Sequence, residues 1–148
     1  MKKTIKILMI ALCSIILCNN MANAGNDKPI PTNMLPMKAQ ALLSCYFSQQ
    51  RVVLATRESG IVGKSYDVVL QNGTKLEFDK RGYLTEIECK RGAVPAKLIP
   101  QRIKNFIYSN YPEERVKKME LDKNKYEVEL SNGIELTFNK HFKLIDID

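Results

Sequence analysis

The strongest constraint on the fold is a stretch of 23 residues that occurs twice. Residues 66–88 read YDVVLQNGTKLEFDKRGYLTEIE, and residues 126–148 read YEVELSNGIELTFNKHFKLIDID. At a fixed offset of 60 the two copies agree at ten positions, most of them apolar or turn residues. None of the ten is a residue that we expect to act as a nucleophile, a metal ligand or a catalytic acid. The repetition therefore informs about architecture more than about chemistry.

Each copy predicts a β-hairpin followed by a third strand. In the second copy Tyr126, Val128 and Leu130 alternate with polar residues, the period of a half-buried strand. Asn132-Gly133 follows, and Asn-Gly is typical of a two-residue type I′ turn, in which both central residues have positive φ. The first copy repeats the pattern around Asn72-Gly73. A hairpin alone is marginal in water, so we expect an upstream segment to cover its apolar face.

Upstream of each hairpin the sequence predicts one amphipathic helix. After Pro36, apolar residues recur at helical spacing as Ala39, Leu42, Leu43, Tyr46 and Phe47. After Pro100 the same stripe holds Ile103, Phe106, Ile107 and Tyr111, and Pro112 ends the helix. The offset between the copies is 64 here, so the first copy has four additional residues. We place them in a longer loop, Glu58 to Ser65.

With one more short strand per copy, at residues 51–57 and 115–121, these elements define a fold. The predicted fold class is α+β, with two tandem α-β-β-β-β repeats at residues 35–91 and 92–148 and antiparallel sheets with helices packed on one face. The two sheets could also join edge to edge. The predicted core combines helix residues with the apolar strand positions Val68, Leu70, Leu76, Phe78, Ile87, Val128, Leu130, Leu136, Phe138 and Ile147.

Residues 1–24 have the pattern of a secretory signal peptide. Lys2, Lys3 and Lys6 precede a short apolar run, and Ala22-Asn23-Ala24 matches a signal-peptidase cleavage site. The run is short for a membrane span, so we expect no stable membrane insertion after cleavage. The mature chain would then be periplasmic or secreted in a bacterial envelope. Residues 25–34 are polar with two prolines and are predicted to form a flexible leader.

Composition argues against nucleic acid as a partner. The formal charge of +7 includes the three signal lysines, and without them 20 basic and 16 acidic residues leave +4. That balance is ordinary for a soluble surface, and no basic run is interleaved with aromatic residues.

Cys45 and Cys89 are the only cysteines that remain after cleavage, in a chain bound for an oxidising compartment. Three interpretations are open: a disulfide between them at the helix–sheet interface, two separate buried thiols, or a redox or metal role. The sequence has no Cys-x-x-Cys pair, and the single histidine, His141, cannot complete a zinc site. We expect His141 to be a solvated turn residue, and we predict no catalytic residue, cofactor or metal.

The strand positions opposite the apolar set would point to the other face of the sheet. As a partner-binding face, the outward positions are Asp67, Val69, Lys75, Glu77, Glu127, Glu129, Glu135 and Thr137. Five acidic residues could cluster on this face: Glu127, Glu129, Glu135, Asp146 and Asp148. They are explained as the solvated face of an antiparallel sheet, and the alternative is an acidic surface that meets a basic partner or weakly holds a cation such as calcium.

The run from Ile99-Pro100 through Tyr111-Pro112 and Val116 to Tyr126 and its Asn-Gly hairpin resembles a known family. It is similar to the PepSY-like, β-lactamase-inhibitor-protein-like repeats of secreted bacterial proteins, and the resemblance covers roughly residues 35–148. It implies a periplasmic, non-enzymatic protein whose open sheet face binds another protein.

Three departures from the family pattern stand out. Phe47-Ser48 stands where the second copy has Tyr111-Pro112, and Phe142 stands where Gly82 closes the equivalent turn. The chain also has no Trp, one of the residues that dominate tight protein interfaces, and it lacks an inhibitor's aromatic concave face.

The functional expectation is a non-enzymatic binding or regulatory module of the envelope. It would recognise an envelope or secreted protein through the exposed sheet face and the Glu58–Ser65 loop. Two alternatives remain open: an inhibitor of an enzyme such as a peptidase or a β-lactamase, and a binder of a small ligand or an ion.

Overall fold

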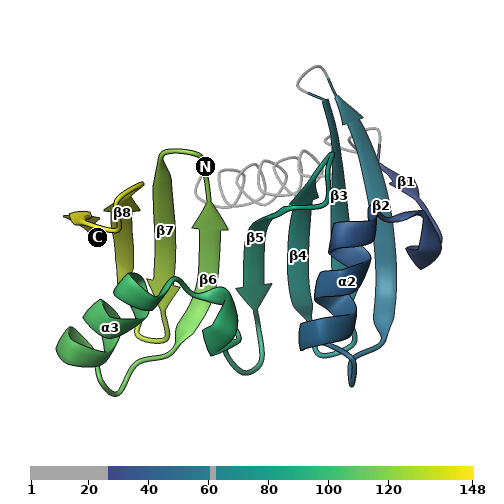
Figure 1. The fold of residues 1–148 in the computed structure, drawn as a ribbon. Helices are drawn as coiled ribbons and strands as arrows, with labels where there is room; N and C mark the ends of the chain where they lie inside the picture. The colour runs from purple at the N-terminus through teal and green to yellow at the C-terminus, as the bar shows by residue number, and fades with distance from the viewer. Residues whose placement is uncertain (1–26, 61–62) are drawn as a thin grey trace, which may run out of the picture.

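The computed structural model describes residues 27–60 and 63–148, and the predicted signal peptide lies outside them. The first elements are β1 (Lys28–Pro29), the 3-10 helix η2 (Thr32–Met34), α2 (Met37–Tyr46), β2 (Val52–Gly60), β3 (Gly63–Leu70), β4 (Thr74–Asp79) and β5 (Leu84–Cys89). The remaining elements are the 3-10 helix η3 (Ala96–Leu98), α3 (Gln101–Asn110), β6 (Val116–Leu121), β7 (Lys125–Leu130), β8 (Glu135–Asn139) and β9 (Leu144–Ile147). Figure 1 shows a broad twisted sheet with α2 and α3 lying along it.

The predicted fold class, α+β with two tandem α-β-β-β-β repeats and antiparallel sheets with helices packed on one face, is wrong. The described chain is mostly one nine-stranded sheet with strand order β1 to β9, in which every neighbouring pair is antiparallel. Within the described residues, two ten-residue α-helices accompany the sheet. The sheet is not interrupted between the two sequence copies, because β5 pairs with β6.

Pairing between β5 and β6 makes the sheet continuous. Ile87 lies opposite Met119, and both side chains are fully buried on the apolar face of the sheet. Edge strands with apolar side chains are unstable when left unpaired, so the two groups merge into one ladder. We call the apolar face, which carries Phe78 and Phe138, the inner face, and the opposite face the outer face.

The hairpin turns differ from the predicted type I′. The amide of Gly73 donates to the carbonyl of Leu70 at 2.9 Å, and the amide of Gly133 donates to that of Leu130 at 3.0 Å. Only the glycines have positive φ, +84° and +87°, and the asparagines do not. Each loop is thus a type I turn followed by a left-handed glycine, the usual three-residue hairpin connection.

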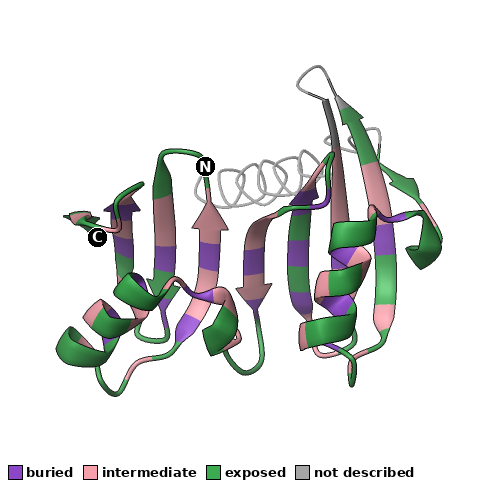
Figure 2. Ribbon diagram, in the orientation of Figure 1, coloured by how far each residue is buried: buried purple, intermediate pink, exposed green. Residues whose placement is uncertain are grey.

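The period-two pattern correctly identified the core of the sheet. The nine strand residues predicted from residue 68 to residue 138 are at most 1% exposed, and Figure 2 shows the buried positions alternating along the strands. Ile147 was wrongly included, because it lies on the last strand and is 50% exposed. Between α3 and β8, the rings of Phe106 and Phe138 meet edge to face with centroids 5.4 Å apart.

Two segments are more extended than the sequence suggested. In the predicted flexible leader, Lys28 and Pro29 form β1 against β2, and the amide of Ile30 donates to the carbonyl of Ala55. The predicted Glu58–Ser65 loop is largely the continuation of β2 and β3, with Glu58 paired to Ser65, and residues 61–62 lie outside the described chain.

Truncation of Phe138 to alanine should be severely destabilising. The side chain is fully buried and contacts Phe106, so its loss leaves a cavity that costs about 3–5 kcal/mol. Urea unfolding followed by circular dichroism measures the change. Ile145→Ala, at a position 58% exposed, is the control and should change stability by less than about 0.5 kcal/mol. Equal losses in the two variants would contradict this description of the core.

Gly82→Ala and Gly133→Ala form a matched pair that separates backbone strain from steric clash. Both glycines have φ near +85°, so alanine is strained at either site. A Cβ at residue 82 would also lie 2.7 Å from Cβ of Pro36 and 3.0 Å from the backbone nitrogen of Ala39, whereas nothing lies within 4 Å at residue 133. Thermal melts should show the larger loss for Gly82→Ala. A larger loss for Gly133→Ala would contradict the contact between this turn and α2.

Candidate binding face

The structure places all eight predicted face residues on the outer face. Four cross-strand pairs bring them together: Asp67 with Glu77, Val69 with Lys75, Glu127 with Thr137, and Glu129 with Glu135. In an antiparallel sheet, directly opposed residues share a face and lie in side-chain contact. The eight positions therefore form two patches, one on β3 and β4 and one on β7 and β8.

A row of carboxylates joins these two patches. Along one line across five strands, Asp67 lies opposite Glu77, Glu77 opposite Glu86, Glu86 opposite Glu120, and Glu120 opposite Glu127. We call these five residues the carboxylate row. Like charges directly opposite one another destabilise a sheet, so five in succession are a cost that core packing elsewhere must outweigh.

Two lysines partly neutralise the carboxylate row. The ammonium nitrogen of Lys118 lies 3.2 Å from Glu86 and 2.5 Å from Glu120, so it bridges the β5–β6 junction. Hydrogen bonding to Glu120, together with Glu86, raises the pKa of Lys118. Lys125 forms an ion pair with Glu127 at the end of the row. Asp67 and Glu77 have no such partner among the ion pairs of the described chain.

The unpaired half of the row holds its protons more tightly than ordinary carboxyls do. Partial burial, followed by the charges of Glu86, Asp67 and Glu120, raises the pKa of Glu77. Partial burial and then Asp27 and Glu58 raise the pKa of Asp67. At the paired end of the row the pKa shifts in the opposite direction, because a hydrogen bond from Lys125 lowers the pKa of Glu127. The outer face thus carries poorly compensated negative charge between β3 and β5.

A shallow hollow of about 360 Å³ lies over the middle of the row. Its lining residues come from β4 to β7 and the β6–β7 turn: Glu77, Thr85, Glu86, Glu120, Leu121, Asp122, Lys125 and Glu127. In residues 27–60 and 63–148, no three histidine, cysteine or acidic side chains are grouped so as to hold a metal ion. The hollow is lined by five acidic side chains and one cation, Lys125.

Exposed apolar side chains flank the acidic region. Leu54 of β2 lies opposite Val69 on the outer face and is 45% exposed, and Val53, at a bulge in the same strand, is 61% exposed. Adjacent exposed apolar residues beside a charged region are typical of an interaction surface. The face therefore combines an apolar margin at β2 and β3 with an acidic centre.

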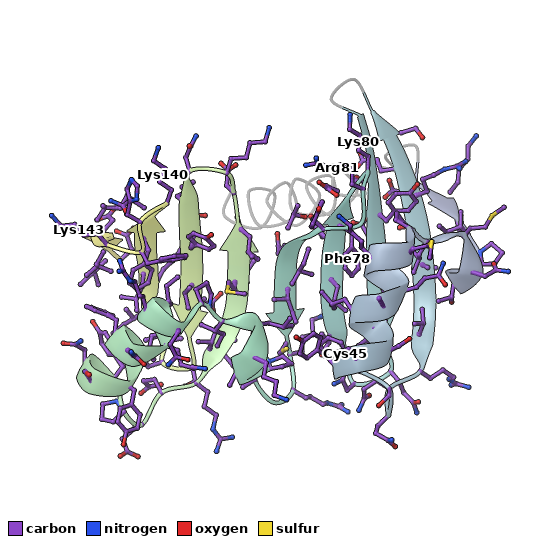
Figure 3. All side chains as sticks on the ribbon, in the orientation of Figure 1. Cys45, Phe78, Lys80, Arg81, Lys140 and Lys143 are labelled. Atoms are coloured by element: carbon purple, nitrogen blue, oxygen red, sulfur yellow. The ribbon has the colours of Figure 1, made fainter. Side chains whose placement is uncertain are left out.

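The structure separates the other candidate residues. Cys45, on α2 (Figure 3), is an exposed free thiol, and Cys89 is a buried free thiol, so the two are not joined by a disulfide in this structure. Burial raises the pKa of the Cys89 thiol, which accepts a hydrogen bond from Thr74 at 3.8 Å. His141 is exposed in the β8–β9 turn, where its amide donates to Asn139. These residues do not form a common site.

Sequence reasoning missed the centre of the face. Glu86, Glu88, Lys118 and Glu120 lie on β5 and β6 and connect the two predicted patches. Their alternation with Ile87 and Met119 is visible in the sequence, so their shared orientation could have been predicted. The pairing of β5 with β6 could not, because no short turn connects these strands.

Comparison with protein families identifies the family to which the chain belongs. Residues 64–146 match the family described as "Putative beta-lactamase-inhibitor-like, PepSY-like". The match spans more than half of the chain, and the protein belongs to this family, which confirms the resemblance seen in the sequence. A search of curated proteins finds no match.

Three solved structures with the same fold come from Bacteroides and are described as "putative" periplasmic proteins. One from Bacteroides vulgatus ATCC 8482 has a TM-score of 0.82 and 47% identity, and the alignment covers 85% of this chain and 99% of that one. A second, from Bacteroides thetaiotaomicron, is described as a "putative calcium-regulated periplasmic protein"; it has a TM-score of 0.81 and 46% identity and covers 83% and 97%. A third, from Bacteroides vulgatus ATCC 8482 and described as being of unknown function, has a TM-score of 0.79 and 33% identity and covers 82% and 98%.

The predicted localisation is confirmed: the protein is periplasmic, like these relatives. Within the described residues, neither α-helix has the length and apolar character needed to cross a membrane.

The two ends of the carboxylate row should respond oppositely to neutralisation. A raised pKa means that the folded state binds the proton of Glu77 more tightly, so stability falls as pH rises from the ordinary value of 4.5 through the folded-state pKa. Glu77→Gln should therefore raise the melting temperature at about pH 7, and this gain should vanish at about pH 3, where the wild-type carboxyl is protonated in both states.

Glu127→Gln is the matched control. The lowered pKa of Glu127 contributes stability above its ordinary value, and this contribution is lost as pH falls through the folded-state pKa. The substitution should lower the melting temperature at about pH 7 and lose its effect in acid. A destabilising Glu77→Gln would contradict the raised pKa of Glu77, and with it the combined cost of burial and of neighbouring negative charge at this position.

Proposed function

We propose that this protein is a non-enzymatic binding module of the periplasm that recognises a basic segment of another envelope protein through its outer face. The observation that carries the proposal is the carboxylate row, five acidic side chains on five adjacent strands. A fold gains nothing from such an arrangement, since like charges opposite each other are unfavourable. A cationic partner would relieve that repulsion on binding.

The distribution of cations supports a basic partner. Figure 3 shows Lys80, Arg81, Lys140 and Lys143 at turns, where the strands end, and these four residues are exposed. These four positive charges therefore lie at the rim, whereas Lys118 bridges two carboxylates in the middle of the outer face and Lys75 of β4 lies beside Val69. Complementary charge of this kind raises the association rate and selects the partner.

The apolar margin supports a partner that is also amphipathic. Leu54 and Val53 are exposed next to the acidic region, and burial of apolar area supplies most of the affinity in protein interfaces. A segment with cationic and apolar side chains would contact the row and the margin together.

The family description supports one alternative, in which the bound partner is an enzyme and binding inhibits it. This alternative uses the same face and is tested by adding the protein to a β-lactamase or an envelope peptidase at equal concentration. Loss of turnover at that ratio would favour the inhibitor. Undiminished turnover would favour a binding module that does not inhibit the enzyme.

Glu77→Lys should weaken recognition strongly. Cross-linking in envelope extract, followed by titration of the captured protein, should give saturable binding that weakens with added salt. The variant should bind at least about tenfold more weakly, because it replaces attraction with repulsion at the centre of the face. Glu113→Lys makes the same charge change in the exposed loop between α3 and β6 and should bind like the wild type.

Equal binding by the two variants would overturn the assignment of the outer face, and binding that does not saturate would overturn the binding function itself. Circular dichroism of each variant confirms that it is folded before it is compared.

A further inference from the structure

A second cavity lies on the helix side of the sheet, away from the carboxylate row. It has a volume of about 220 Å³ and is enclosed by η3, α3 and the start of β6. Its base consists of buried aliphatic side chains: Val94, Ile99, Ile107 and Val116. Burial of a charged or strongly hydrated group against such a base is unfavourable, so the part of a ligand that reaches the base must be apolar.

The mouth of this cavity has a different character. Two aromatic residues border it, Tyr111 and the 78% exposed Tyr108, together with the cations Lys104 and Arg115. No carboxylate of the described residues lies within 4.0 Å of either cation. Glu114, the one acidic lining residue, accepts a hydrogen bond from the hydroxyl of Ser131. The mouth therefore offers positive charge above an apolar floor.

The first half of the chain contains a cavity in the corresponding place, which shows that the fold does not require this chemistry. That cavity, of about 320 Å³, lies between η2, α2 and β2, and its Leu43, Phe47 and Val52 precede Ile107, Tyr111 and Val116 by 64 residues.

At the same offset, Gln40 stands in place of Lys104 and Ser44 in place of Tyr108. The Gln40 amide donates at 2.7 Å to the carbonyl of Leu35, so it is satisfied within the chain. Lys104 makes only a long contact of 3.5 Å to the carbonyl of Ala96. The shared floor follows from the packing of helix on strand, whereas the cationic and aromatic mouth is particular to the second cavity.

We propose that the cavity bounded by η3, α3 and β6 binds a small apolar carboxylate. Its volume is below the roughly 300–1,000 Å³ of pockets for drug-sized ligands, so it accommodates a single aromatic or branched apolar group. The carboxylate lies at the mouth, where Lys104 and Arg115 supply charge-assisted hydrogen bonds. A free acid and the last residue of a polypeptide share this chemistry.

The test uses 3-phenylpropionate as the probe and 3-phenylpropanamide as its uncharged match. Titration followed by amide NMR should shift resonances of residues 94–116 saturably with the acid. The amide should bind about tenfold more weakly, the factor expected from loss of one charge-assisted hydrogen bond. Equal binding of acid and amide, or no saturable shift with the acid, would overturn the proposal.

Substitutions locate the site. Lys104→Gln installs the residue of the first cavity and should weaken binding of the acid several-fold, whereas Gln40→Ala should leave it unchanged. Shifts confined to residues 32–52 would place the ligand in the other cavity and would overturn the assignment. Binding should persist in Glu77→Lys, which keeps this test independent of the outer face.

A second titration distinguishes a free acid from the carboxyl terminus of a polypeptide as the source of the ligand. N-acetyl-Ala-Ala-Phe presents the same apolar group and carboxylate at the end of a peptide. Tighter binding of this peptide than of 3-phenylpropionate would support the carboxyl terminus of a polypeptide, and weaker binding would support a free acid. Failure of both ligands would overturn the proposal.

Discussion

The pairing of β5 with β6 is the interaction on which the rest of the molecule depends. On the inner face Ile87 and Met119 are fully buried against each other, and on the outer face Lys118 bridges Glu86 and Glu120. Without this pairing the chain would be two small sheets with two exposed apolar edges. With it, one ladder runs through all nine strands, and the carboxylate row and its hollow extend across the junction.

The two faces of the sheet differ in role: the inner face stabilises the fold, and the outer face is the one that we propose for recognition. The inner face contains the large apolar side chains whose burial outweighs the repulsion among the outer carboxylates. That surplus allows the outer face to keep an arrangement that is unfavourable in isolation, as functional surfaces commonly do. The cavity near α3 combines the same two kinds of surface. Its floor is part of the core, whereas the cationic residues at its mouth are not needed for folding.

The parts of the structure that could be predicted are those with a local signal. Alternation in β3, β4, β7 and β8 identified the core and all eight predicted outer-face positions, because side-chain direction follows sequence parity. The turn type was missed because Asn-Gly also suits a type I turn with a left-handed glycine. The single sheet was only one of the options that the sequence left open, and the centre of the carboxylate row was missed, because β5 and β6 are separated by a 3-10 helix and α3. Ile147 has the parity of a core residue, but it lies on the last strand, where no further strand of the described chain shields it.

The short first strand has a consequence for how the protein behaves at high concentration. A broad sheet whose outermost strand is long and flat templates the addition of further chains, which is the route to fibrils. Here β1 has two residues, of which Pro29 lacks an amide hydrogen and Lys28 brings a charge, and β9 is short and irregular beside β8. Both edges of the sheet thus resist the addition of further strands. The protein can therefore keep an open, strongly charged sheet without becoming a seed for aggregation.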